Sequence, residues 1–473
     1  MNNIDLAFAS IEEVSRLIRR RKISPVELTQ ILLQRIERLN PKLNAYLTLT
    51  PETALAQAKQ AEAELFGPRG RKSRRDRGPL HGIPLSLKDN ISTAGIRTTA
   101  GSRILRNFVP ENDAAVVTLL KEAGAVLLGK THLHEFAYGT TTNNPHYGPA
   151  RNPWNLDRIP GGSSGGSAAA LAAGLCFGSI GTDTGGSIRI PAALCGVTGF
   201  KPTRGNVSDE GVIPLSPSLD CTGPMARSAR DTAILFRAIS RPHVFPKGAW
   251  SAAKSLRKPK KVRLGLPKEF FFDVLGEEVA RSFDAAMRNF RKLGTQMKEI
   301  SIPLLNDTED AGNKIAWPEA THYHRLSRYF PAHSAEYGED VRSRLEIGDT
   351  VTTVAYLQAL DQRKRFIQQL LEKMDDAGVD ALAVPTTPVA APLIDEEKIQ
   401  IDGKFYPTRA ILLRLNRPAN LAGVPAISIP CGTTSTGLPI GLQLIGRHAA
   451  DLLLLQIANL YETAHPNLRR PLL

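Results

Sequence analysis

Cysteines are few in this chain of 473 residues, and no run of apolar residues is long. The four cysteines, Cys176, Cys195, Cys221 and Cys431, form no C-x-x-C pair and are too sparse for the disulfide framework of a secreted protein. No apolar stretch approaches the ~20 residues that span a bilayer. Asp5 stands where a signal peptide would need basic residues. We therefore expect reduced thiols, no membrane segment and a cytoplasmic location.

Disorder is also excluded, because 42% hydrophobic and 22% charged residues are ordinary values for a folded protein. The unusual quantity is the formal charge of +14. Residues 69–77 carry a net +5 and residues 254–263 a net +6, so these two segments hold most of it. Both contain or adjoin proline or glycine and lack apolar periodicity, which favours exposed loops. Contact with nucleic acid or a partner protein through these loops is the alternative.

Helix and strand signals alternate along the chain. Ser10 with Glu13, and Ser24 with Glu27, have the spacing of N-terminal helix caps. Strands that are apolar on both sides and separated by helices indicate a buried, largely parallel sheet, which the late strands are expected to rejoin. We expect helices over residues 11–20, 25–39, 51–65, 113–123, 166–173, 277–293 and most of 305–376, and strands over 45–49, 125–128, 175–180, 262–266, 381–384, 426–430 and 440–445.

Two nucleotide-like or serine-hydrolase-like matches are interpreted as chance. Residues 124–131 satisfy the G-x-x-x-x-G-K-[ST] expression of a phosphate-binding loop. Such a loop must follow a strand, whereas residues 125–128 are expected to be the buried strand itself. Ser251 and Lys254 match S-x-x-K, but they lie in the second basic region without any surroundings that would support catalysis.

A possible metal site is also set aside. His132, His134 and Glu135 stand close together, but no third ligand follows at a recognisable spacing. Position 138 is Tyr138, so the H-E-x-x-H helix of metalloproteases is absent. Ordinary polar residues after a strand are the better interpretation, and no metal or cofactor is expected.

Three segments together suggest a nucleophilic enzyme. Residues 161–167 and 181–189 place serines among glycines, the first run before an Ala-rich helix and the second after a buried strand. Lys88 lies inside an apolar run, where low polarity would reduce its proton affinity. Each segment alone is more often an ordinary turn or a lysine that reaches solvent. Taken together they fit a serine nucleophile with a lysine base, a known substitute for the Ser–His–Asp triad.

These segments resemble the amidase signature family, and the resemblance extends over nearly the whole chain. It includes HGIPLSLKDN at 81–90, GKTHLHEFAYGTT at 129–141, the run from 161 to 202, NLAGVPAISIPCG at 420–432 and LPIGLQLIG at 438–446. The fold that this implies is α/β, with a central mixed β-sheet surrounded by α-helices. The implied activity is hydrolysis of carbon–nitrogen bonds other than peptide bonds, with a Ser–cis-Ser–Lys catalytic centre and an acyl-enzyme intermediate.

The resemblance also assigns individual roles. Ser187 matches the nucleophile, Ser163 the bridging serine, with a cis peptide between Gly162 and Ser163, and Lys88 the base. A substrate pocket is expected to include Tyr138, Gly139 and Leu413. The backbone N–H groups expected to stabilise the oxyanion belong to Thr184, Gly185, Gly186 and Ser187.

One position guides the choice of substrate. The glutamine-hydrolysing subunit of tRNA-dependent amidotransferases, which works inside a complex, resembles D-x-x-x-x-x-x-N-L-A-G, with an acid that reads the amino group of glutamine. Here Leu413 precedes Asn420 by seven residues, and Ile411, Leu412 and Leu415 make the segment largely apolar. We therefore expect a free-standing amidase acting on neutral, hydrophobic or aryl amides, with carbamates and esters sharing the same acyl chemistry. The glutamine-hydrolysing subunit of an amidotransferase complex remains the alternative.

The chain is expected to form one domain, as a monomer or homodimer, with a small-molecule substrate rather than nucleic acid or a membrane as its partner. Its expected parts are N-terminal helices at 1–68, the catalytic motifs at 80–250, a mostly helical pocket region at 262–415, and C-terminal strands and a helix at 416–473 that rejoin the core.

Overall fold

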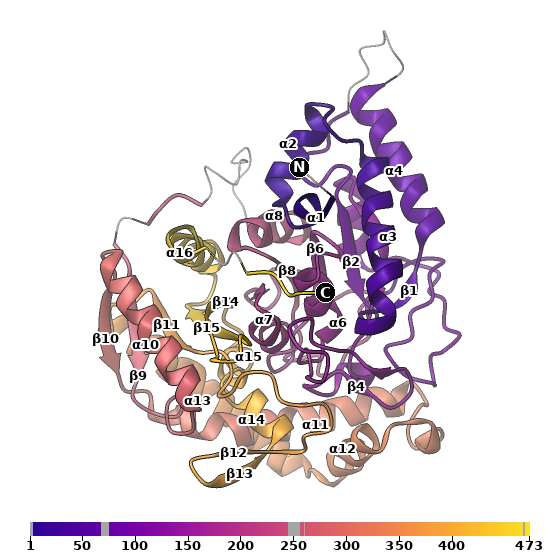
Figure 1. Ribbon diagram of the computed structural model, residues 1–473. Helices are drawn as coiled ribbons and strands as arrows, with labels where there is room; N and C mark the ends of the chain where they lie inside the picture. Colours follow the sequence, from indigo (N-terminus) through magenta and orange to yellow (C-terminus); the bar gives the residue numbers. More distant parts are fainter. Residues whose placement is uncertain (1–2, 68–74, 245–255, 260, 467–468) are drawn as a thin grey trace.

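A sheet of eleven strands runs through the molecule. The computed structural model describes residues 3–67, 75–244, 256–259, 261–466 and 469–473. Figure 1 shows the chain with helices arranged around this sheet. In spatial order the strands are β1 (Tyr46–Leu49), β3 (Val126–Thr131), β2 (Pro84–Lys88), β6 (Gly178–Thr182), β8 (Thr222–Ala226), β7 (Thr198–Lys201), β14 (Ala426–Thr433), β15 (Pro439–Gly446), β11 (Ala381–Pro385), β9 (Arg263–Pro267) and β10 (Gln296–Ile300).

The strand directions correct the expectation of a largely parallel sheet. Pairing is parallel only in the groups β3–β2–β6 and β11–β9–β10 and is antiparallel elsewhere, so the sheet is mixed. The reason is that β8 lies between β6 and β7, and that β14 and β15 form a hairpin. Helices cover both faces, so antiparallel strands here are as apolar as parallel ones, and composition alone does not distinguish them.

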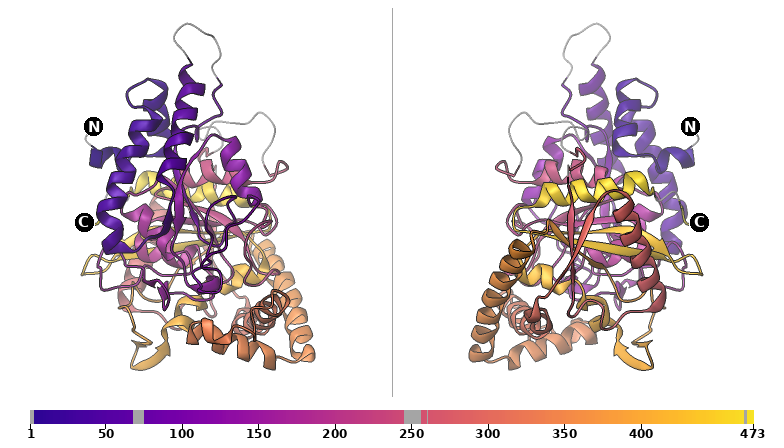
Figure 2. Two further views of the ribbon diagram at one scale, coloured as in Figure 1. Left: turned by 90° about the vertical axis from the view of Figure 1, so that its right-hand side faces the viewer. Right: turned by 90° about the vertical axis from the view of Figure 1, so that its left-hand side faces the viewer.

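Two helical layers enclose the sheet, as the side views in Figure 2 show. Gly178 of β6 faces Leu235 on one side, and Gly181, three residues on, faces Ser164 and Ile188 on the other. The helices are α1 (Asn3–Ala7), α2 (Ile11–Arg19), α3 (Pro25–Leu43), α4 (Pro51–Phe66), α5 (Ala115–Glu122), α6 (Gly165–Ala172), α7 (Arg189–Cys195), α8 (Ala229–Ile239), α10 (Glu277–Lys292), α11 (Thr308–Leu326), α12 (Glu339–Thr350), α13 (Thr353–Ala377), α14 (Thr408–Arg414), α15 (Arg417–Ala422) and α16 (Asp451–Ala464). Helix α8 therefore covers one face, whereas α6 and α7 follow the residues on the other.

Shorter elements connect these layers. Two small antiparallel pairs lie outside the main sheet, and three 3₁₀ turns occur between helices and strands. These elements are β4 (Asn143–Asn144) with β5 (Gly148–Pro149), β12 (Lys398–Ile401) with β13 (Lys404–Pro407), and the turns η1 (Glu135–Ala137), η2 (Pro303–Asp307) and η3 (Ser334–Glu336).

The capping signals produce the expected helix starts. The Ser24 hydroxyl accepts from the backbone N–H of Glu27, and the Glu27 carboxylate accepts from the backbone N–H of Ser24. Helix α3 nevertheless runs past the expected end at residue 39. It ends at Asn44, which adopts a left-handed conformation, and the side chain of Asn40 accepts from the next two backbone N–H groups.

The motif at 124–131 is not a phosphate loop in the structure, because Val126–Thr131 is the buried strand β3. The amine of Lys130 contacts the Ile91 carbonyl and the Thr98 hydroxyl. Ser251 and Lys254 lie outside the described residues. Within the described ranges, no three His, Cys, Asp or Glu side chains gather as a metal site, and no helix is long and apolar enough to cross a membrane.

Most of the first basic segment also lies outside the described residues, as does part of the second. Near the end of the first segment, two side chains form ion pairs. Asp76 pairs with Arg19 at 2.7 Å, and Arg77 pairs with Glu64 at 2.5 Å. These described charges therefore contact the N-terminal helices.

Candidate active site

Lys88 ends strand β2 and is completely buried. Its Nζ atom lies 2.7 Å from the Ser163 hydroxyl and 2.7 Å from the Thr182 hydroxyl. Burial lowers the pKa of Lys88 to about 7, although Asp183 and Asp220 act in the opposite direction. The amine is thus fixed on a serine and can hold or release a proton near neutral pH.

Ser163 stands just before helix α6, and the Gly162–Ser163 peptide is cis. The backbone is tightly enclosed here, since a Cβ on Gly162 would lie 2.7 Å from the carbonyl carbon of Thr140. Thr142 donates to the carbonyl of Gly161, and the carbonyl of Ser163 accepts from the backbone N–H of His134. These contacts explain the glycine at position 162 and fix the serine that faces Lys88.

Ser187 lies in the turn between β6 and α7, and Asp183 organises that turn. The Asp183 carboxylate accepts from the backbone N–H groups of Gly186 and Ile188 and pairs with Arg189 at 2.9 Å. Burial raises the pKa of Asp183, but the charge and hydrogen bonds of Arg189 outweigh it and hold that pKa far below its usual range. The carbonyl of Ser187 accepts from the backbone N–H of Ser164, which joins the turn to the second serine segment.

The turn also presents backbone donors. Among the described residues, the N–H groups of Thr184, Gly185 and Ser187 have no intramolecular acceptor. Gly186 is a correction to the expected set, because its N–H already donates to Asp183 at 2.8 Å. Three donors beside the Ser187 hydroxyl therefore remain available to a developing negative charge.

A pocket opens above Ser187 and contains about 490 Å³ of space, part of it open to solvent. This is in the range of small-molecule sites. Tyr138, Gly139 and Leu413, which the sequence predicts in the pocket, all line it. The full lining is Ala137, Tyr138, Gly139, Thr140, Thr184, Gly185, Ser187, Leu215, Leu219, Gly312, Ala316, Arg409, Leu413, Arg417, Asn420 and Leu421.

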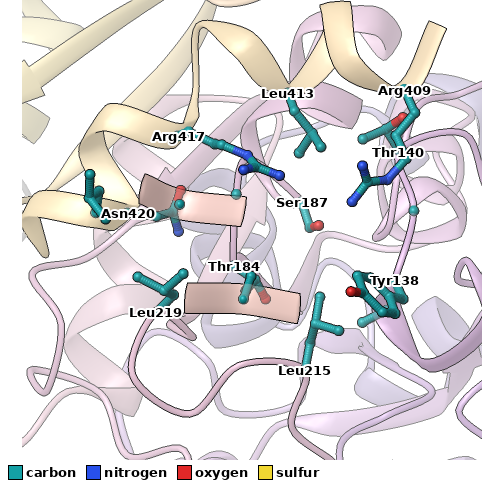
Figure 3. Close-up of a pocket in the computed structure, with 16 residues that line it drawn as sticks. Tyr138, Thr140, Thr184, Ser187, Leu215, Leu219, Arg409, Leu413, Arg417 and Asn420 are labelled. Carbon is teal, nitrogen blue, oxygen red and sulfur yellow. The ribbon is translucent and has the colours of Figure 1, made fainter. Parts of the chain in front are cut away.

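Sequence reasoning missed two arginines of this lining, Arg409 and Arg417. Figure 3 shows their guanidinium groups pointing into the pocket from either side of Ser187. The signal was a four-residue spacing. Arg409, Leu413 and Arg417 recur at the helical period, and the residues between α14 and α15 keep helical dihedral angles, so the three side chains share one face. The segment is apolar on the opposite, core-facing side, which hid this pattern.

Known proteins share this fold and its motifs. The model of the family described as Amidase matches residues 27–455. The chain is similar to the A subunit of the glutamyl-tRNA(Gln) amidotransferase of Geobacter metallireducens, with 39% identity and 98% of each chain covered. It is also similar to the solved structure of an amidase, with a TM-score of 0.87, 34% identity, and 96% of this chain and 99% of that chain covered. A chain of a vestigial protein complex related to the origins of an s-triazine catabolic enzyme has a TM-score of 0.89 and 31% identity, with 98% of this chain and 100% of that chain covered.

Proposed function

The chain belongs to the amidase family, has the amidase signature fold and is a hydrolase of carbon–nitrogen bonds other than peptide bonds, and we propose that Ser187, Ser163 and Lys88 form its catalytic centre. The observation that carries this proposal is the 2.7 Å contact between Lys88 Nζ and the Ser163 hydroxyl in a site closed to solvent. An amine with a pKa of about 7 can serve as a base at neutral pH.

In the proposed reaction, Lys88 takes a proton from Ser163 while Ser163 takes one from Ser187. The Ser187 oxygen attacks the amide carbonyl, and the resulting oxyanion accepts hydrogen bonds from the N–H groups of Thr184, Gly185 and Ser187. The C–N bond then breaks as the proton returns through Ser163 to the leaving nitrogen. Water hydrolyses the acyl-enzyme by the same relay and regenerates the free serine. Carbamates and esters can follow the same steps.

Acylation of Ser187 tests this proposal. The protein would be treated with an aryl sulfonyl fluoride, which forms a stable adduct with activated serines, and the modified peptide identified by mass spectrometry. We expect one adduct, on Ser187, and much slower labelling in Lys88→Met. An adduct on another residue, or labelling at the same rate in Lys88→Met, would overturn the proposed catalytic centre.

A second candidate is the glutamine-hydrolysing subunit of an amidotransferase complex. Identity of 39% over 98% of both chains to a protein of that name supports it. Leu413 argues against it, because it lines the pocket where the recognised pattern has an acid for the amino group of glutamine. Ammonia release from glutamine, measured with the isolated protein and with any chains that co-purify, separates the two candidates. Glutamine hydrolysis only in the presence of partner chains would favour the second candidate.

The predicted preference for neutral, hydrophobic amides needs revision. Leu215, Leu219 and Leu413 supply apolar contacts for part of an acyl group. The two arginines on the same walls, however, do not suit an uncharged substrate. A role for the basic loops in nucleic-acid binding has no support from the pocket. The cytoplasmic location, the division of the single domain and the monomeric or homodimeric state stay predictions.

A further inference from the structure

The pocket carries positive charge without a balancing acid. Arg409 and Arg417 line it, and none of its sixteen lining residues is Asp or Glu. Both residues lie on the face shared by α14 and α15, and in Figure 3 their guanidinium groups approach each other across the space above the Ser187 hydroxyl. Cations on the wall of an enclosed pocket are normally paired, so this arrangement requires a partner.

Arg409 has the larger deficit. Its Nε atom is buried and has no hydrogen-bond partner, and the contact recorded for its guanidinium is the ring of Tyr138, at 5.9 Å. Burial, together with the charges of Arg344 and Arg417, lowers the pKa of Arg409 to about 9. The nearby acid Asp340 is already held by His134 at 2.8 Å and by Arg344 at 2.8 Å.

Arg417 is buried and only partly satisfied. Its Nη1 atom donates to the backbone carbonyl of Glu309 at 3.0 Å. The Glu309 carboxylate itself is turned to Arg414, at 3.6 Å. Arg417 therefore contacts a neutral carbonyl, and its remaining donors are free to meet a ligand.

Two uncharged groups repeat the same deficit. The hydroxyls of Tyr138 and Thr140 are buried without hydrogen-bond partners, and both residues line the pocket. Burial raises the pKa of Tyr138 to about 12, so this hydroxyl is a neutral donor. Buried polar groups in folded proteins are nearly always hydrogen-bonded, and four such groups around one space point to an acceptor supplied by the ligand.

We propose that the pocket binds amides whose acyl group ends in a carboxylate, that is, monoamides of dicarboxylic acids. Arg409 and Arg417 bind the carboxylate, because a planar guanidinium matches its two oxygens. Leu215, Leu219 and Leu413 contact the methylene groups between the carboxylate and the scissile amide. No lining acid can accept an ammonium group, which disfavours amino-acid amides such as glutamine. This inference rests on the proposed role of Ser187 as the nucleophile.

The test uses pairs of substrates that differ only in charge. Malonamate, succinamate and glutaramate would be compared with their neutral isosteres 3-methylbutanamide, 4-methylpentanamide and 5-methylhexanamide. We expect kcat/KM of the wild-type protein to favour the best anionic amide by about 100-fold, as is typical of two charge-assisted contacts. Equal or better turnover of the neutral isosteres would overturn the inference.

Substitutions locate the preference. Arg409→Gln and Arg417→Gln should each lower kcat/KM for the anionic amide by about 10- to 100-fold and leave the neutral isostere within about threefold. Arg414→Gln is the matched control, since Arg414 is on α14 but outside the pocket lining. Unchanged anion preference in both pocket variants would overturn the assignment. The wild-type ratio remains decisive if a variant does not fold.

Failure of the inference can be distinguished from failure of the proposed catalytic centre. The aryl sulfonyl fluoride is uncharged, so its reaction with Ser187 reports on the nucleophile alone. Binding is tested without turnover by the thermal shift that the dicarboxylate glutarate produces. We expect stabilisation of the wild-type protein and a reduced shift in Arg409→Gln. A shift equal in both proteins would overturn the inference even if Ser187 is not the nucleophile.

Discussion

Two walls of one pocket differ in how completely their polar groups are satisfied. The catalytic wall consists of Lys88, Ser163 and the turn 183–188, and the recognition wall of Arg409, Leu413 and Arg417. On the catalytic wall, the Asp183 carboxylate has backbone and side-chain partners, and the Lys88 amine contacts two hydroxyls. On the recognition wall, Arg409 has a buried Nε without a partner. The catalytic wall is complete in the free protein, whereas the recognition wall is completed by a ligand.

The difference has a structural origin. The catalytic wall follows the ends of β2 and β6, two strands in the interior of the sheet. The recognition wall lies on two short helices, α14 and α15, outside the sheet, facing α11. Strands hold reacting atoms in fixed positions, and a helix face outside the sheet can change its side chains without disturbing them. The first wall therefore determines the reaction and the second the substrate.

The largest expected effect comes from removing the nucleophile of the catalytic wall. Ser187→Ala should lower kcat by at least about 10⁴-fold, because acyl transfer loses its attacking oxygen. Ammonia release measures the loss, and circular dichroism checks the fold. Ser167→Ala is the matched control, since its buried hydroxyl contacts Thr131 at 2.7 Å instead of Lys88. Comparable activity in Ser187→Ala and Ser167→Ala would rule out the assignment.

Removing the base should have the next largest effect. Lys88→Met should lower kcat/KM by about 10³-fold, within the usual range for a general base. With a pKa of about 7, Lys88 is protonated and inactive below neutral pH and free above it. Wild-type kcat/KM should thus rise about tenfold per pH unit below 7 and level off above. The variant should lose this rise, and a pH profile of unchanged shape would show that another group is titrated.

A charge change on the recognition wall should alter selectivity with little effect on the chemistry. Leu413→Asp places a carboxylate beside Arg409 and Arg417, where it would compete with an anionic substrate and could accept an ammonium group. The ratio of kcat/KM for glutamine to that for succinamate should rise by about 10- to 100-fold. Leu413→Asn is the uncharged control. If both variants shift the ratio equally, the charge is not the cause.

The smallest effect should come from narrowing the gap between the walls. An added Cβ at Gly185 would lie 3.2 Å from Leu413 and 3.8 Å from Arg417. Gly185→Ala keeps its backbone N–H, so kcat should change little, while KM for the longest acyl group should rise by about tenfold at most. Steady-state kinetics across the amide series measure this. A fall in kcat with unchanged KM would instead indicate damage to the oxyanion donors.

The sequence was most informative where one residue type has few physical explanations. Lysine inside an apolar strand, and serines among glycines beside a helix start, are costly unless they are used, and the structure brings Lys88 and Ser163 together. The strand directions were not accessible, because helices on both faces give parallel and antiparallel strands the same composition. The insertion of β8 between β6 and β7 depends on contacts distant in the chain.

The recognition wall was harder to predict for a different reason. A count of apolar residues described 411–415 correctly but averaged over the two faces of a helix. The period that joins Arg409, Leu413 and Arg417 was present in the sequence, yet its meaning depends on the pocket that the helix faces. Gly186 shows the same limit on a smaller scale. The motif identifies the turn, but only the structure shows that Asp183 already uses that N–H.

The order of the strands sets a timetable for synthesis. Strands β14 and β15 come late in the chain, yet they lie between β7 of the early part and β11 of the middle part. While the ribosome is still translating, β7 and β11 each present an edge whose native partner does not yet exist, and open strand edges favour association with other chains. Arg189, which pairs with Asp183, also donates to the side chains of Asn420 and Gln443. The two halves of the sheet thus remain separate until residues 426–446 have emerged, and the turn that holds Ser187 gains its last partners only then.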